Sequence, residues 1–216
     1  LDIHDAVKMA AHSKTLEPHT LIEIQQTLAS VRELRTHLSK LSKELPLLWN
    51  IAEGIVGLPQ LEKHIGSCLM PTGEILDSAS PTLTEVRQQL RKVREQLSSR
   101  LEAIIRSPRG HRIIQEPIIT EREGRYVIPV KIECRKDIRG IVHDISNTGA
   151  TVFIEPWTTV ELGNELRELV TEERHEVERI LRDLSAEVGA YETEISHNLE
   201  LAAELDLALA KARYAR

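Results

Sequence analysis

Gly124-Arg-Tyr-Val-Ile-Pro-Val-Lys131 differs in its pattern from the rest of this chain and says most about the fold. The same character continues through Gly140-Ile-Val-His-Asp-Ile-Ser146 and Gly149-Ala-Thr-Val-Phe-Ile-Glu-Pro156. From Tyr126 to Ile132 every second residue is apolar, which is typical of a half-buried strand. These segments predict a small β-rich region inside a chain whose other patterns are helical.

Two turns divide this region. Arg122-Glu-Gly-Arg125 and Asn147-Thr-Gly149 each place a glycine between β-rich segments, where its tolerance of positive φ suits a hairpin. The sequence therefore predicts two β-hairpins in a small antiparallel sheet. Pro129 has no backbone N–H donor, so we expect its strand to lie at an edge of the sheet or to carry a bulge there.

Long helices are predicted on both sides of the sheet. Apolar residues recur at steps of three and four from Leu21 to Leu45, from Leu83 to Ile104, and from Leu162 to Leu209 with a weak point at Gly189. Ser80-Pro81 is a typical start for the second run. The predicted fold class is mainly α with a small antiparallel β insertion (α+β): a long antiparallel helical lever, or coiled-coil stalk, that carries a β-hairpin tip.

Three regions follow from these patterns. Residues 1–106 are expected to form a helical core and the first lever helix, and residues 107–155 a β-rich clamp tip. Residues 156–216 are expected to form the returning lever helix and a further core helix. Because the chain does not begin with Met, we expect it to be a piece of a longer protein.

Composition argues against several classes of protein. Cys68 and Cys134 are far apart and form no Cys-x-x-Cys pair, so a disulfide framework and a zinc site are unsupported and a reducing cytoplasm fits. The apolar runs are too short to span a bilayer, and the start lacks a signal-peptide pattern. The histidines form no metal motif, and no nucleotide-binding or nucleophile motif occurs. We therefore expect no catalytic residue, metal or cofactor in this chain.

The formal net charge of −6 hides a basic segment. Between Arg106 and Gly140 nine Arg and Lys face five acidic residues, whereas from Glu155 to Arg216 seven face fifteen. Screening limits the reach of a charge to roughly 10 Å at ordinary salt, so the local excess decides phosphate binding. We predict a nucleic-acid-binding tip that uses Arg109, Arg112, Arg122, Arg125, Lys131, Arg135, Lys136 and Arg139.

Plainer interpretations stay open. The basic residues can be ordinary solvated charges, or charges that protect an exposed sheet edge. Direct reading of bases is disfavoured, because Tyr126 is the sole aromatic among the basic residues. Phe153-Ile-Glu155 looks like the wedge-and-acceptor pair of mismatch-sensing proteins, but a Phe in an apolar strand is more often buried packing. His143 and Asp144 are adjacent in a strand and point to opposite faces, which disfavours an acid–base pair.

Several longer motifs occur in order along essentially the whole chain. They are Gly124–Pro156, Val160-Glu-Leu-Gly-Asn-Glu-Leu-Arg-Glu-Leu169, Gly73-Glu-Ile-Leu-Asp-Ser-Ala-Ser-Pro81, Gln115-Glu-Pro117 and Ala203-Glu-Leu-Asp-Leu-Ala-Leu-Ala-Lys-Ala-Arg-Tyr214. Together they resemble the middle of the bacterial MutS family, in the branch called MutS-two. One departure is Gly163, where the family usually has Asn beside the matching Asn164, and we expect it to loosen the start of the third helical run.

The resemblance implies the core, lever and clamp region of that family. In the family the levers are long helices, and the clamp is the tip that closes around a nucleic-acid duplex. The family's ATPase domain, which uses ATP and magnesium, and its C-terminal nuclease-like domain would lie beyond Arg216. Family members act as homodimers held largely through the ATPase domain, so the resemblance implies that this piece alone can be monomeric. The branch is associated with binding branched DNA and suppressing homologous recombination, and some members with splitting collided ribosomes.

The residues and the resemblance together predict a non-catalytic clamp. It would grip the backbone of branched or duplex DNA without sequence preference, and the stalk would carry motion between the tip and an ATPase. Two alternatives stay open: a clamp on ribosomes or rRNA that uses the same basic residues, and a coiled-coil scaffold for protein partners. No membrane partner is expected.

Overall fold

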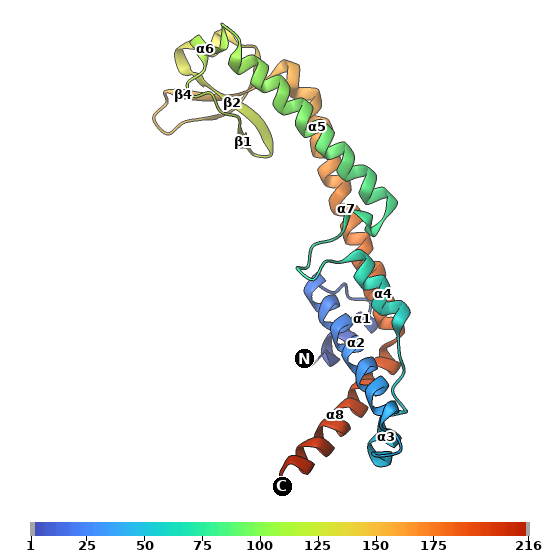
Figure 1. Cartoon of the computed structure of the whole chain (residues 1–216). Helices are drawn as coiled ribbons and strands as arrows, with labels where there is room; N and C mark the ends of the chain where they lie inside the picture. Colours follow the sequence, from blue (N-terminus) through green and yellow to red (C-terminus); the bar gives the residue numbers. More distant parts are fainter. Residues whose placement is uncertain (1–2, 215–216) are drawn as a thin grey trace. The chain divides into compact units, whose positions relative to one another are not determined.

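The computed structural model describes residues 3–214. The chain divides into two compact units: a helical unit, Leu1–Leu83 with Glu176–Arg216, and a sheet-bearing unit, Thr84–His175. Two helices, α5 (Pro81–Arg106) and α7 (Val160–Ala190), contribute residues to both units (Figure 1). The division into 1–106, 107–155 and 156–216 was drawn on expected roles, and it stays a prediction. Among the described residues, no helix has the length and apolar character needed to cross a membrane.

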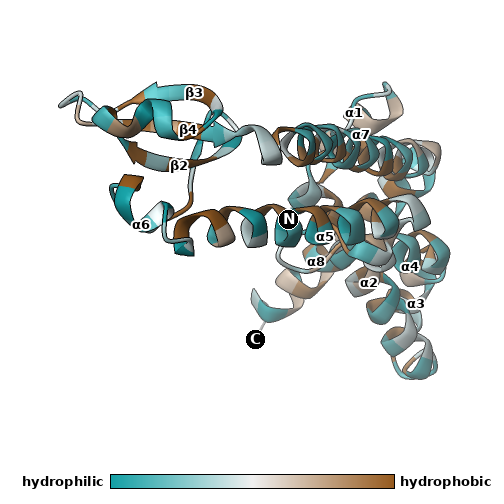
Figure 2. Ribbon diagram, turned by 90° about the horizontal axis from the view of Figure 1, so that it is seen from above, coloured by the Kyte–Doolittle hydropathy of each residue, from teal (hydrophilic) through white to brown (hydrophobic). Residues whose placement is uncertain are grey.

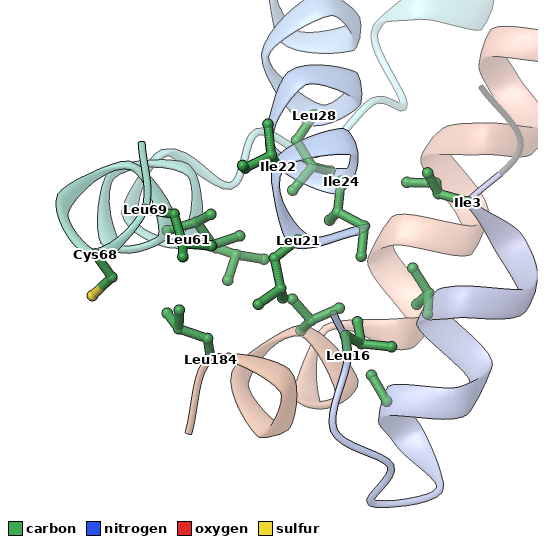
Figure 3. Packing of buried hydrophobic residues seen from close by; sticks show 14 of the residues in the cluster. Ile3, Leu16, Leu21, Ile22, Ile24, Leu28, Leu61, Cys68, Leu69 and Leu184 are labelled. Carbon is green, nitrogen blue, oxygen red and sulfur yellow. The ribbon is translucent and has the colours of Figure 1, made fainter. Parts of the chain in front are cut away.

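The helical unit contains short and medium helices around an aliphatic core. Its elements are α1 (His4–Ala11), α2 (Pro18–Lys40), α3 (Pro46–Ala52), α4 (Pro59–Cys68), the 3₁₀ turn η1 (Asp77–Ala79), the second part of α7, and α8 (Glu192–Tyr214). Leu21 from α2, Leu61 from α4 and Leu184 from α7 lie together in this core (Figure 3). A smaller cluster around Val31 and Leu205 joins α2 and α3 to α8.

The first predicted helix is too long, and the third breaks where expected. α2 ends at Lys40, and Leu45 just before Pro46 is 40% exposed with a non-helical ψ of 58°. A residue that precedes proline is driven out of the helical conformation, which accounts for Leu45 and for the start of α3 at Pro46. The weak point predicted at Gly189 is confirmed, because α7 ends at Ala190 and α8 begins at Glu192.

The sheet-bearing unit carries both predicted hairpins. The strands are β1 (Thr120–Arg122), β2 (Arg125–Lys131), β3 (Gly140–Ile145) and β4 (Thr151–Pro156), joined antiparallel in the order β1-β2-β4-β3. Gly124 and Gly149 have φ of 74° and 72°, the left-handed conformation that glycine adopts without steric cost. The fold class predicted from the sequence, mainly α with a small antiparallel β insertion, is confirmed.

The edge position predicted for Pro129 is wrong, because β2 lies between β1 and β4. The bulge lies instead in β3, between Val142 and Asp144. The carbonyl of Pro129 accepts from the backbone N–H of Gln115, and the N–H position of a strand residue faces the same side as its carbonyl. On that side β1 has already ended its pairing at Val127, so no strand bond is lost.

The helices α5 and α7 run antiparallel within this unit. Arg87 Nε of α5 lies 2.7 Å from Glu173 Oε1 of α7, and Arg100 Nη1 donates to the carbonyl of Thr158, just before α7, at 3.0 Å. Figure 2 shows apolar residues, in brown, recurring along α5. They share one buried cluster with the sheet and with the start of α7; its members include Val86, Leu90, Val93, Leu97, Leu101, Ile128, Val130, Val152, Ile154, Leu162, Leu166 and Leu169.

Short elements complete the tip. The helix α6 (Gly110–Ile113) follows α5, the 3₁₀ helix η2 (Ile132–Asp137) follows β2, and the 3₁₀ turn η3 (Trp157–Thr159) leads from β4 into α7. A backbone bridge between Ile114 and Val130 sets the end of α6 beside β2, and Figure 2 shows α6 next to that strand. The first two elements contain three of the eight basic residues singled out in the sequence, Arg112, Arg135 and Lys136, and Arg109 and Arg139 lie just outside their ends.

Candidate nucleic-acid interface

The eight predicted basic residues fall into two groups by exposure. Arg122, Arg125 and Lys131 belong to β1 and β2 and are half-buried. The other five are exposed and lie on or beside α6 and η2: Arg109, Arg112, Arg135, Lys136 and Arg139. The fold therefore gathers the second group at the tip and uses the first group within the sheet.

Arg125 is engaged by a buried carboxylate. Its Nη1 donates to Glu155 Oε1 at 3.1 Å, and its Nη2 donates to Asn164 Oδ1 at 2.6 Å. His143 Nε2 lies 2.7 Å from Glu155 Oε2 on the other oxygen of the same carboxylate. The side chain of Glu155 is 2% exposed, and a buried carboxylate without a partner is strongly destabilising. The phosphate contact predicted for Arg125 stays a prediction, and these bonds disfavour it.

Gly163 gives this buried pair its space. A Cβ at position 163 would lie 2.6 Å from Glu155 Oε1 and 2.8 Å from Arg125 Nη1, closer than real Cβ atoms approach such atoms. Gly163 lies inside α7, three residues after its start at Val160. The absence of a Cβ lets α7 approach the Arg125–Glu155 pair at this position. The loosening of the helix start that we expected from the sequence stays a prediction.

Arg122 and Lys131 are also held by the fold. The Cζ of Arg122 lies 4.1 Å from the centroid of the Phe153 ring, and its Nε donates to Asp144 Oδ2 at 3.1 Å. Phe153 thus packs on the sheet beneath a guanidinium, in agreement with a packing role. His143 and Asp144 have different partners, Glu155 and Arg122, but the opposite faces predicted for them are wrong. The bulge in β3 breaks the alternation: Asp144 pairs with Phe153, and His143 reaches Glu155 on the same face of β4. Lys131 Nζ donates to the carbonyl of Arg112 at 3.1 Å.

The exposed group keeps most of its charge available. Within residues 3–214, the side chains of Arg112, Arg135, Lys136 and Arg139 make no hydrogen bond and no ion pair. Arg109 is partly engaged, since its Nη2 donates to the backbone carbonyl of Asp137. Exposed cations without partners attract anions over a Debye length, and they release counterions when phosphate binds.

A groove of about 1080 Å³ opens beside these residues. The end of α5, α6, η2 and η3 line it, and its basic lining comes from Arg109, Lys136 and Arg139. Trp157 also lines it and is 59% exposed. The backbone N–H of Trp157 donates to the carbonyl of Arg139 at 3.1 Å, so the end of β4 sets the indole beside the basic residues.

Sequence reasoning missed Trp157 and the partners of Glu155. It looked for aromatic residues between the basic ones along the chain, whereas Trp157 meets them across the sheet. A signal was present: Trp157 precedes the apolar stripe of α7, which begins at Leu162, so it was not accounted for as core. For Glu155 the signal was a charged residue at the end of the apolar run Val152–Ile154.

Comparisons with known proteins show which proteins this chain is similar to. No protein-family model matches it. It is 43% identical over 215 residues to the Endonuclease MutS2 of Pelotomaculum thermopropionicum and 41% identical over 217 residues to that of Geobacillus sp. strain WCH70. It is 38% identical over 219 residues to the Putative endonuclease MutS2 of Bacillus subtilis strain 168.

These alignments cover 99–100% of this chain but only 27–28% of the length of the three relatives. The similarity therefore concerns one segment of much longer proteins. The resemblance seen in the motifs is confirmed: over its whole length, this chain is similar to one segment of the MutS2 proteins, the MutS-two branch of the MutS family.

Proposed function

We propose that the sheet-bearing unit binds the phosphate backbone of DNA, branched or duplex, without sequence preference and without catalysis. The observation that carries this proposal is the group of exposed cations without partners, Arg112, Arg135, Lys136 and Arg139, gathered around α6 and η2. Each phosphate that such a surface neutralises releases condensed counterions, which favours binding and makes it sensitive to salt.

This proposed interface is narrower than the set predicted from the sequence. Arg122 and Arg125 hold Asp144 and Glu155, and Lys131 holds a backbone carbonyl, so their first role is to shape the tip. Arg109 contributes charge while its bond to the carbonyl of Asp137 ties α6 to η2. The phosphate contacts then fall to residues that the fold does not need.

In a longer protein of the MutS2 type, this binding would serve as a clamp. The helices α5 and α7 would carry motion between the tip and an ATPase domain that binds ATP and magnesium, since small rotations at the base of a stiff helix pair become large displacements at its end. Homodimers would form through that domain. The names of the relatives describe endonucleases, and suppression of homologous recombination is the consequence we expect for binding to branched DNA.

Two other kinds of partner, ribosomes and other proteins, would contact this chain through different features. A clamp on ribosomes would use the same cations on rRNA phosphates, so ribosomes form a separate arm of the test below. A protein-interaction scaffold would use the helices and would be indifferent to nucleic acid. The exposed unpaired cations favour a nucleic-acid partner over the scaffold.

The test measures binding of the 216-residue chain to four-way-junction DNA, linear duplex and purified ribosomes across a salt series. A variant with Arg135, Lys136 and Arg139 changed to Glu reverses the tip. A control variant with Lys14, Lys43 and Lys63 changed to Glu makes the same charge change on exposed residues of the helical unit. Circular dichroism establishes that both variants are folded.

We expect the tip variant to lose at least tenfold in affinity for DNA at low salt, and the control variant to lose much less, because charge acts within roughly 10 Å. Equal losses in both variants would show that net charge alone acts, and would overturn the proposed interface. Tighter binding to ribosomes than to either DNA would replace DNA by rRNA as the partner.

A further inference from the structure

The groove beside Trp157 combines an aromatic face with positive charge. Arg109, Lys136 and Arg139 line it together with the indole, and Asp137 is the one acidic residue among its lining residues. Arg109 donates to the backbone carbonyl of Asp137, so a cation lies next to the residue that carries this acidic side chain. The groove is therefore positive overall, and an anionic ligand fits its charge.

Hydrogen bonds hold the backbone of Trp157 and of its neighbours in place. Its N–H donates to the carbonyl of Arg139 at 3.1 Å, and its carbonyl accepts from the N–H of Val160 in the first turn of α7. The next carbonyl, that of Thr158, accepts from Arg100 Nη1 at 3.0 Å. Thr159, which is fully buried, donates from Oγ1 to the carbonyl of Pro156 at 2.9 Å.

The indole itself is not used by the core. Trp157 is 59% exposed and is absent from the buried cluster that joins α5, the sheet and α7, although its neighbour Pro156 is buried. A large aromatic side chain gains most of its favourable energy when it is covered. An ordered backbone that presents an uncovered indole beside cations suits stacking, because an indole has only two side-chain torsions to fix on binding.

We propose that this groove binds an unpaired nucleotide, with the base stacked on Trp157 and the adjacent phosphates held by Lys136 and Arg139. Every base has a π face, so stacking tolerates any sequence and adds to the backbone contact. In a duplex the faces of the bases are covered by their neighbours. The groove therefore distinguishes single-stranded or unpaired positions from continuous duplex, a preference that phosphate contacts alone do not give.

This inference rests on the proposed nucleic-acid binding and sharpens it. It assigns to Trp157 a role in choosing structure, whereas the cations of α6 and η2 supply affinity for any backbone. The ligand chemistry is the same for DNA and RNA strands, so both belong in the test.

The first measurement compares Trp157→Ala and Trp157→Phe with the unaltered chain. The probes are oligothymidylate and oligouridylate of about 12 nucleotides, a length that one such site can hold, and a linear DNA duplex. We expect Trp157→Ala to lose about tenfold in affinity for the single strands, Trp157→Phe to lose less, and duplex affinity to change by no more than about twofold.

The second measurement reads stacking directly. The chain has two tryptophans, and Trp49 packs against the small core cluster of the helical unit. A Trp49→Phe variant leaves Trp157 as the sole indole, so its fluorescence reports on the groove. We expect quenching when a single strand binds and little change when duplex binds, because only an unpaired base can cover the indole.

The outcomes separate the two proposals. Duplex binding that persists while Trp157→Ala has no selective effect on single strands, or fluorescence that does not change, overturns the stacking role and leaves backbone binding standing. If the unaltered chain binds none of the probes at low salt, the proposed function fails and this inference fails with it. The source of the strand follows from whether oligothymidylate or oligouridylate binds more tightly.

Discussion

Two of the three buried glutamates in the described part of the chain, one taken from each unit, show how the same residue type is held in two ways. In the helical unit, Glu176 accepts from Arg179, three residues further along α7, and from the hydroxyl of Ser80, which also caps the amide of Leu83. In the sheet-bearing unit, Glu155 accepts from Arg125 and lies against His143, residues 30 and 12 positions away.

The difference concerns solvent as well as sequence distance. Arg179 is 49% exposed and also pairs with Asp183, whereas Arg125 is 15% exposed. The first carboxylate can exchange its partner for water at small cost, and the second cannot. At the tip, basic residues near a buried acid are therefore structural, and those without one are the residues that we propose for phosphate binding.

Removing the charge of each glutamate tests the comparison most strongly. We expect Glu155→Gln to lower the free energy of unfolding by about 3 kcal/mol, because it leaves a nearly buried guanidinium without its counter-charge. Glu176→Gln should cost about 1 kcal/mol, because Arg179 keeps Asp183 and water as partners. Urea denaturation measures the loss of unfolding free energy in both variants. Hydrogen exchange of peptides from β2 and β4 shows whether the loss in Glu155→Gln is located in the sheet. Equal losses would show that burial of the arginine does not matter.

Gly163→Ala tests the space beside Glu155. Alanine inside a helix usually stabilises by about 1 kcal/mol relative to glycine, but here its Cβ would press on the buried pair. We expect a net destabilisation of about 2 kcal/mol. Gly66→Ala in α4 is the control, since its Cβ would meet the amide end of Gln25, whose bond to the carbonyl of Glu62 involves no buried charge pair. A stabilised Gly163→Ala variant would mean that the pair moves freely.

A pH titration tests the pair of Glu176 and Arg179, and it is the prediction with the smallest expected effect. Hydrogen bonds from Arg179, helped by Ser80 and opposed by burial, lower the pKa of Glu176 from its usual 4.5 to about 2. A pKa that is lower in the folded state means stability that is complete above pH 4.5 and is lost as the pH falls toward 2. We expect this loss to be about 1 kcal/mol smaller in Glu176→Gln, since Arg179 is partly solvated. Identical pH profiles for the two chains would contradict the assignment.

The spacing of apolar residues along the chain predicted most of the fold. The period of two in 126–132 and the glycines of the two turns located the hairpins, because alternation marks which face of a strand is buried. The stripe from Leu83 to Leu101 marked the buried face of α5 in the same way. The prediction failed where periodicity continued without burial, as at Leu45, and where the strand order was needed, as at Pro129.

The amino-acid sequence was enough to predict the long helical runs, the two hairpins, the basic segment and the resemblance to the MutS-two branch, because each depends on residues near one another along the chain. Tertiary structure alone decided which cations are free. Arg125 and Arg135 look alike in the sequence, but the pairing of β2 with β4 brings one to Glu155 and leaves the other exposed. The pairing of β3 with β4 likewise sets Trp157 beside Arg139. Such meetings depend on strand register between distant segments, which no local pattern specifies.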